Sequence, residues 1–115
     1  MMDARYDLEE RTFQFASDCR EMIKSLNFTT ANIEDGKQLI KSSGSIGANY
    51  IEANEKLGEK DFLFRLKISR KEAKESRYWL RLLKIGNKEL IEIDKLINES
   101  EELRKILSEI IKKFE

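Results

Sequence analysis

Apolar residues recur at intervals of three and four along most of the chain, which is typical of amphipathic α-helices. Interruptions near 27–30, at Gly58 and at 86–87 divide this pattern into four segments. We predict helices over about residues 8–26, 30–56, 59–85 and 94–114. Short connections make consecutive helices antiparallel neighbours, so the predicted fold class is an all-α, up-down-up-down four-helix bundle. A chain of 115 residues suits one such domain, covering 1–115.

Each predicted helix has an apolar face that we expect to form the core. In chain order these faces contain Phe13, Ala16, Cys19, Ile23 and Leu26; Gly36, Leu39, Ser43, Ile46, Tyr50 and Ala53; Phe62, Leu66, Ser69, Ala73, Ser76, Leu80 and Leu83; and Leu96, Ser100, Leu103, Leu107, Ile110 and Phe114. Thr30 and Asp94 are the predicted N-caps of the second and fourth helices, because their side-chain oxygens can accept from free backbone N–H groups.

The middle of the second helix is rich in small residues: Ser42, Ser43, Gly44, Ser45, Gly47 and Ala48. Glycine inside a helix costs about 1 kcal/mol relative to alanine. Two glycines within one turn therefore predict that the backbone of a neighbouring helix approaches closely here. The alternative is a chance cluster in a tolerant helix.

Composition limits the chemistry. Lys and Arg total 22, as do Asp and Glu, and this neutrality does not favour a strongly nucleic-acid-binding surface. With no histidine and one cysteine, the chain cannot build an internal disulfide, a usual zinc site or a Ser-His-Asp triad. Carboxylate-only chemistry stays open, but di-iron bundles use Glu-x-x-His motifs. We expect no enzyme activity and no cofactor, and we interpret Cys19 as a core residue.

The hydropathy of the chain predicts a soluble protein. Residues 1–10 contain no apolar run, so no signal peptide is expected. No stretch approaches the roughly 20 apolar residues of a membrane span. We therefore expect a cytoplasmic protein without a membrane partner.

A basic stripe lies beside the apolar face of the third helix. Its members alternate by three and four: Lys67, Arg70, Lys74, Arg77, Arg81 and Lys84. Residues 59–86 hold nine basic and four acidic residues. One hypothesis is contact with the phosphates of RNA or DNA, although no Gly-rich phosphate loop accompanies the stripe. The other is a solvated face paired with acidic residues of the fourth helix, namely Glu99, Glu101, Glu102 and Glu109.

The opposite flank of the third helix carries Ile68, Glu72, Glu75, Trp79 and Leu82. One bundle core seldom needs two apolar flanks on one helix, and Trp is enriched at protein interfaces. We therefore predict that this flank packs against another subunit. The polar side chains that would complete the layer are Asn49 and Glu52 of the second helix. The alternative is that Trp79 covers the core of the monomer.

Two stretches carry a resemblance to a known family. They are residues 42–55 (SSGSIGANYIEANE) and 60–83 (KDFLFRLKISRKEAKESRYWLRLL), of which 71–83 is the most specific. Together they cover about a third of the chain. They resemble the second and third helices of the bacterial four-helix-bundle proteins, also called 23S rRNA intervening-sequence proteins. The remaining helices match in length and pattern.

The resemblance implies a homo-oligomer, with a homopentamer as the expected assembly. Some members of the family are encoded within insertions in large-subunit ribosomal RNA genes. A related protein, the accessory variability determinant of diversity-generating retroelements, is a basic pentamer that binds nucleic acid and a reverse transcriptase. The present chain departs from that relative in its neutral charge. The signature positions here are Asn49, Glu52, Glu72, Glu75 and Trp79.

The sequence thus predicts a non-enzymatic, oligomeric binding or scaffold protein that contacts RNA or DNA through the basic stripe. The alternative is a protein-interaction module that docks a separately encoded effector without binding nucleic acid.

Overall fold

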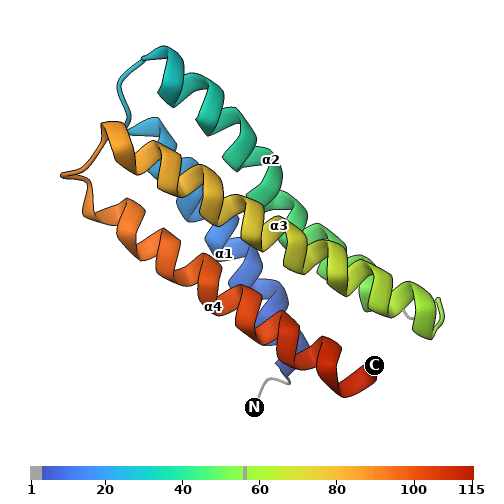
Figure 1. The fold of residues 1–115 in the computed structure, drawn as a ribbon. Helices are drawn as coiled ribbons and strands as arrows, with labels where there is room; N and C mark the ends of the chain where they lie inside the picture. Colours follow the sequence, from blue (N-terminus) through green and yellow to red (C-terminus); the bar gives the residue numbers. More distant parts are fainter. Residues whose placement is uncertain (1–3, 56) are drawn as a thin grey trace.

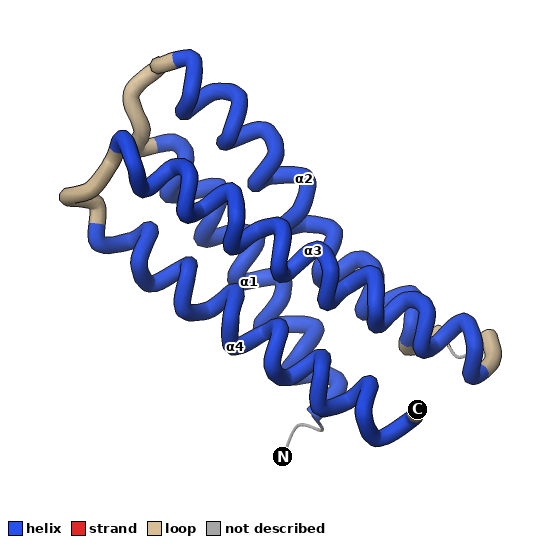
Figure 2. The backbone as a smooth tube through the Cα atoms, in the orientation of Figure 1, coloured by secondary structure: helices blue, strands red, loops and turns tan. Residues whose placement is uncertain are grey.

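The chain folds into four helices. The computed structural model describes residues 4–55 and 57–115, with side chains from residue 7 onward. The helices are α1 (Ala4–Lys24), α2 (Thr30–Ala53), α3 (Glu59–Gly86) and α4 (Ile91–Phe114) (Figure 1). Short loops join them, and the described residues contain no strand (Figure 2). The predicted all-α class is therefore confirmed.

Consecutive helices run antiparallel and pack around one core (Figure 1). Contacts join α1 with α2, α2 with α3, α3 with α4, and α4 with α1. Within the described part of the chain, α1 makes no close backbone contact with α3, nor α2 with α4. These two pairs are therefore the diagonals of a bundle that measures 44 × 28 × 19 Å.

The predicted faces of α2 and α3 form the core. All six residues of the α2 face are buried, and on α3 only Phe62 is half-exposed. The buried serines of this seam are satisfied by hydrogen bonds: Ser69 Oγ donates to the Ile46 carbonyl at 2.7 Å, and Ser76 Oγ donates to Ser42 Oγ at 2.9 Å. Small side chains therefore line the seam between α2 and α3, whereas the predicted close approach at the glycines is made by α1, because Gly47 faces Thr12.

The predicted face of α1 is wrong at Phe13, whose side chain is 69% exposed. From residue 7 onward, the buried residues of α1 are Leu8, Thr12, Phe15, Cys19 and Met22, which also alternate by four and three. The polar Thr12 conceals this pattern in the sequence. Its hydroxyl is buried at no cost in hydrogen bonding, because it donates to the Glu9 carbonyl at 2.9 Å. Burial raises the pKa of the Cys19 thiol to about 12, which suits a core residue.

The beginning and end of α4 also differ from the prediction. The helix begins at Ile91 after Leu90, which offers no side-chain cap, so Asp94 is not the N-cap. Asp94 lies in the first turn, where its charge suits the helix dipole. Near the other end Ile111 is buried in place of Ile110, and Phe114 is 56% exposed.

Three further helix ends are set by single residues. Thr29, not Thr30, caps α2, because its Oγ1 accepts from the Asn32 N–H at 3.1 Å. The helix ends at Ala53, before the predicted end, and Lys56 lies outside the described residues. Gly58 precedes α3 with φ of 137°, a conformation that residues with a Cβ rarely adopt. Asn87 ends α3, near the predicted position.

Candidate functional site

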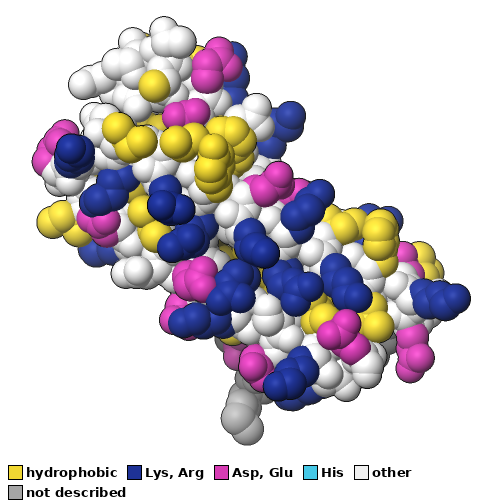
Figure 3. Space-filling model, viewed as in Figure 1, with side chains coloured by type: hydrophobic (Ala, Val, Ile, Leu, Met, Phe, Trp, Pro, Cys, Tyr) yellow, Lys and Arg dark blue, Asp and Glu magenta, His cyan; other side chains and the backbone are white. Residues whose placement is uncertain are grey.

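The third helix presents three different surfaces around its buried seam. The basic stripe faces α4, the Trp79 flank faces α2, and an exposed crest (Phe64, Tyr78 and Ile85) lies between them. Figure 3 shows Lys and Arg side chains gathered over α3 and α4, with hydrophobic side chains beside them. The candidate site is the basic stripe together with this crest.

Three cations of the basic stripe have carboxylate partners. Lys67 pairs with Glu115 at 3.3 Å, and Arg77 pairs with Glu101 at 3.7 Å. Lys84 pairs with Asp94. All three pairs cross from α3 to the C-terminal residue or to α4, and they are partly exposed, so each contributes at most about 1 kcal/mol.

The predicted acidic partners are mostly wrong. Among the described residues, only Glu101 of the four glutamates pairs with a stripe cation. Glu99 instead accepts two hydrogen bonds from Arg11 of α1, at 2.7 and 2.9 Å. Arg77 shares Glu101 with Arg104, which also donates a hydrogen bond to this carboxylate. The hydrogen bond from Arg104 lowers the pKa of Glu101. The sequence did not identify Asp94 as a partner because α4 was predicted to begin three residues too late.

The other three stripe cations have no carboxylate partner in the described chain. Arg70 reaches only the Ser108 hydroxyl, at 3.5 Å. Lys74 and Arg81 are exposed and make no ion pair with described residues. The stripe is therefore neutralised at its two ends and at Arg77, while half of its positive charges face solvent without an anion.

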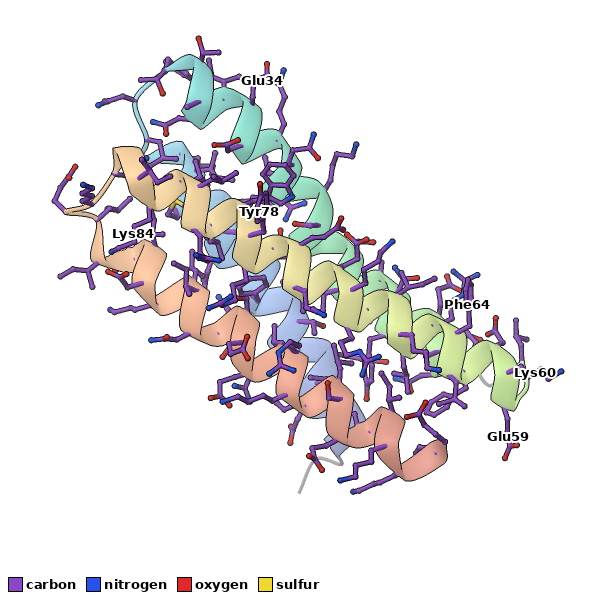
Figure 4. All side chains as sticks on the ribbon, viewed as in Figure 1. Glu34, Glu59, Lys60, Phe64, Tyr78 and Lys84 are labelled. Carbon is purple, nitrogen blue, oxygen red and sulfur yellow. The ribbon has the colours of Figure 1, made fainter. Side chains whose placement is uncertain are left out.

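The crest adds residues that the sequence analysis did not single out. Tyr78 is 54% exposed, and its ring meets Trp79 edge-on, with centroids 5.1 Å apart. Phe64 and Ile85 are also exposed. Figure 4 shows Phe64 and Tyr78 along the edge of α3 nearer to α2, and Lys84 on the side nearer to α4. The seven-residue spacing of 64, 71, 78 and 85 was the available sequence signal for this crest.

The predicted interface flank is partly covered by its own subunit. Ile68, Glu72, Trp79, Leu82 and Asn49 are half-buried, whereas Glu75 and Glu52 are exposed. Trp79 packs against the core, so it does cover the monomer.

Asn49 does not join a polar layer with Glu72 and Glu75 within one chain. Its amide oxygen accepts from Arg65 Nη1 at 3.4 Å, and its amide nitrogen donates to the Ser45 carbonyl at 2.9 Å. Glu52 makes no hydrogen bond or ion pair among the described side chains. Whether another subunit joins these groups remains a prediction.

The carboxyl group of Glu72 lies in an unfavourable environment for its charge. Its side chain is 16% exposed, and Glu75 lies one turn away. Burial, and then the charge and hydrogen bond of Glu75, raise the pKa of Glu72. The described residues contain no cluster of three His, Cys, Asp or Glu side chains that could hold a metal ion. Burial and the neighbouring Glu75 therefore disfavour the charged form of Glu72.

These features define the class: a small all-α bundle whose third helix presents a cationic face and an exposed aromatic crest. The chain belongs to the 23S rRNA-intervening sequence protein family, whose model matches residues 5–109. It is similar to a crystal structure from Bacteroides thetaiotaomicron VPI-5482, a protein of unknown function from the S23 ribosomal protein family. The two share 32% identity with a TM-score of 0.82, over 94% of this chain and 97% of that one. No curated protein matches.

Membership in the family confirms the resemblance found in residues 42–55 and 60–83. A separate property concerns membranes: none of the helices in the described residues is long and apolar enough to cross one.

Proposed function

We propose that this protein is a non-enzymatic, oligomeric binding protein of the cytoplasm that contacts nucleic acid through the basic stripe of α3. One observation carries the proposal: Arg70, Lys74 and Arg81 are positive charges on one edge without a carboxylate partner in the described chain. Nucleic-acid phosphates would supply the missing anions and release counterions on binding. The family description, which refers to the intervening sequence of 23S rRNA, makes RNA the first ligand to test.

Self-association is the second part of the proposal. Beside the half-buried flank of α3, Phe64 is 59% exposed and Ile85 is 67% exposed, and neither residue lines the hollow around Tyr78. Aromatic and aliphatic side chains of this kind form the centres of subunit interfaces. A homopentamer, which the family resemblance implies, would place several basic stripes on one particle.

Titration of fluorescent RNA and DNA tests the contact. Structured RNA, single-stranded RNA and duplex DNA are titrated by anisotropy over a range of salt concentrations. One variant replaces the unpaired cations (Arg70, Lys74 and Arg81) by Gln. The matched control replaces the paired cations (Lys67, Arg77 and Lys84) by Gln.

Each lost phosphate contact reduces the slope of log affinity against log salt by about 0.7 to 0.9. We expect the first variant to lose about two to three units of slope and the control to lose less, because its cations are already partly neutralised. If wild-type protein binds no nucleic acid at low salt, the proposed contact is wrong.

The alternative function is docking of a separately encoded protein effector. The exposed apolar crest favours it, since apolar side chains do not contribute to phosphate binding. Absence of nucleic-acid binding at low salt, together with a stable oligomer, would favour this alternative.

A further inference from the structure

A shallow hollow of about 500 Å³ lies on the outer face of α3, where the basic stripe meets the crest. Its lining combines cations, aromatic rings and one carboxylate: Lys67, Arg70, Lys71, Lys74, Glu75, Tyr78 and Trp79. Four cations line it against one carboxylate, and because Lys67 pairs with Glu115 and Lys71 lies 3.9 Å from Glu72, Arg70 and Lys74 supply its unpaired positive charge. Within it, the unpaired cations Arg70 and Lys74 adjoin the exposed ring of Tyr78.

We propose that this hollow binds an unpaired nucleobase of single-stranded nucleic acid, with the base stacked on Tyr78 and the flanking phosphates held by Lys71 and Lys74. The inference rests on the proposed phosphate contact and specifies the form of nucleic acid that the site takes. RNA and DNA share the chemistry involved, which is an unpaired base on a phosphodiester backbone.

The geometry around Tyr78 suits stacking. More than half of its side chain is exposed, so a face of the ring is accessible. Trp79 meets the ring at an interplanar angle of 78°, and this edge contact supports it from one side. An aromatic ring that is already held in place loses little freedom when a base stacks on it.

The charges around the ring suit a backbone more than an apolar partner. Lys74 makes no ion pair among the described residues, and Lys71 reaches Glu72 only at 3.9 Å. Glu75, which also lines the hollow, repels phosphate and so directs a backbone toward the lysines. Aromatic platforms beside basic grooves are typical of single-strand binding, because every base offers a π-face.

Duplex nucleic acid cannot use this ring in the same way. In a double helix both faces of each base are covered by its neighbours, so stacking on a protein side chain requires an unpaired base. The hollow therefore favours loops, ends and single strands over continuous duplex.

An abasic strand provides the sharpest test. Full-length protein is titrated by anisotropy with a single-stranded RNA, a DNA of the same sequence, an abasic strand of the same length, and a duplex. We expect the strands with bases to bind roughly 5- to 150-fold more tightly than the abasic strand, the range that base–aromatic stacking provides. Trp79, the only tryptophan, should change its emission with bases present and not with the abasic strand.

Substitutions of Tyr78 test whether the preference for strands with bases depends on its ring. Tyr78→Phe keeps a ring and should retain the preference for bases, whereas Tyr78→Leu should bind both strands equally. Because Tyr78 is exposed, neither change should affect folding, which circular dichroism and light scattering can check. The comparison of the two strands uses wild-type protein, so it does not depend on the variants.

The possible results separate this inference from the proposed function. Equal affinity for normal and abasic strands would overturn base stacking and leave the phosphate contact standing. Failure of every strand to bind would overturn both. Duplex bound as tightly as single strands would overturn the single-strand assignment. Polyglutamate is titrated as an acidic polypeptide, and binding as tight as that of RNA that depends on Tyr78 would also overturn it.

Discussion

Gly47 lies where α1 and α2 approach each other closely. A Cβ atom added there would lie 2.7 Å from Thr12 Oγ1 and 3.2 Å from Thr12 Cβ. At Gly44, one turn earlier, the nearest atom would be Arg20 Nη2 at 3.4 Å, the end of a flexible side chain. The two glycines therefore have different roles despite their similar positions.

This difference predicts opposite effects of alanine. Gly47→Ala should destabilise the fold by about 1–3 kcal/mol, because Thr12 and the helix backbone must move apart. Gly44→Ala should be neutral or stabilise by up to about 1 kcal/mol, because alanine is the better helix former. Urea unfolding of both variants measures this. Equal effects would show that Thr12 moves aside freely.

Glu72 should make stability depend on pH. Its pKa is raised in the folded state, first by burial and then by Glu75. Between the ordinary pKa of a glutamate and the raised value, the folded state binds more protons than the unfolded state. The free energy of unfolding should therefore increase as pH falls through this window, and the ionised carboxylate should cost stability at neutral pH.

Glu72→Gln removes this cost. We expect the variant to be more stable than wild type at neutral pH, with a difference that shrinks in mild acid, as measured by urea unfolding at several pH values. Glu109→Gln, an exposed change on α4, is the control and should show no such trend. A wild-type protein that gains no stability relative to Glu72→Gln on acidification would contradict the argument.

At the scale of elements, two asparagines join the connections at one end of the bundle. The Asn87 amide donates to Asn32 Oδ1 at 2.9 Å and to the Leu83 carbonyl at 2.7 Å. Asn32 in turn donates to the Asn27 carbonyl at 3.0 Å. Both side chains are buried, so the end of α3 and the start of α2 are held by polar groups that water cannot replace.

Asn87→Ala should therefore cost about 1–3 kcal/mol, because it leaves Asn32 Oδ1 buried without a donor. Lys88→Ala, at the exposed neighbouring position, should change stability by less than about 0.5 kcal/mol. Thermal unfolding of both variants compares them. If the two changes cost the same, the asparagine pair contributes nothing specific.

The elements also show which information the sequence carries. The faces of α2 and α3 were predicted because their apolar and small residues keep one period without interruption. The face of α1 was mistaken because Thr12 is polar yet buried, a choice that depends on a hydrogen bond within its own turn. The start of α4 was mistaken because Leu90 offers no capping side chain.

The basic stripe could likewise be predicted as a set of residues, but not the pairing of its charges. Pairing depends on the register between α3 and α4, which an individual helix does not encode. The exposure of Tyr78 depends in the same way on how far α2 and α4 cover α3. The pairing of charges and the exposure of a side chain are determined only by how the helices pack against one another.

At the scale of the whole molecule, Phe64 near the start of α3 predicts how copies associate. Phe64 is exposed, with the Arg65 guanidinium 5.9 Å from its ring centroid. Phe64→Glu should leave the monomer fold intact and weaken self-association by about 2 kcal/mol or more, as interface aromatics do. Phe28→Glu, 96% exposed in the α1–α2 connection, is the matched control. Light scattering at micromolar concentration measures both, and a monomeric wild type would contradict the prediction.

The packing of sequence neighbours has a consequence for how the chain reaches this structure. Among the described residues, three of the four helix contacts join consecutive helices, and only α1 with α4 brings distant parts of the chain together. Such mainly local topology is associated with rapid folding, because little loop entropy is lost before contacts form.

We expect the α2–α3 hairpin around Gly58 to form early and the α1–α4 seam to close last. In stopped-flow experiments, Ser69→Ala should therefore slow folding, whereas Arg11→Ala should chiefly speed unfolding; the reverse pattern would place the α1–α4 seam in the folding nucleus.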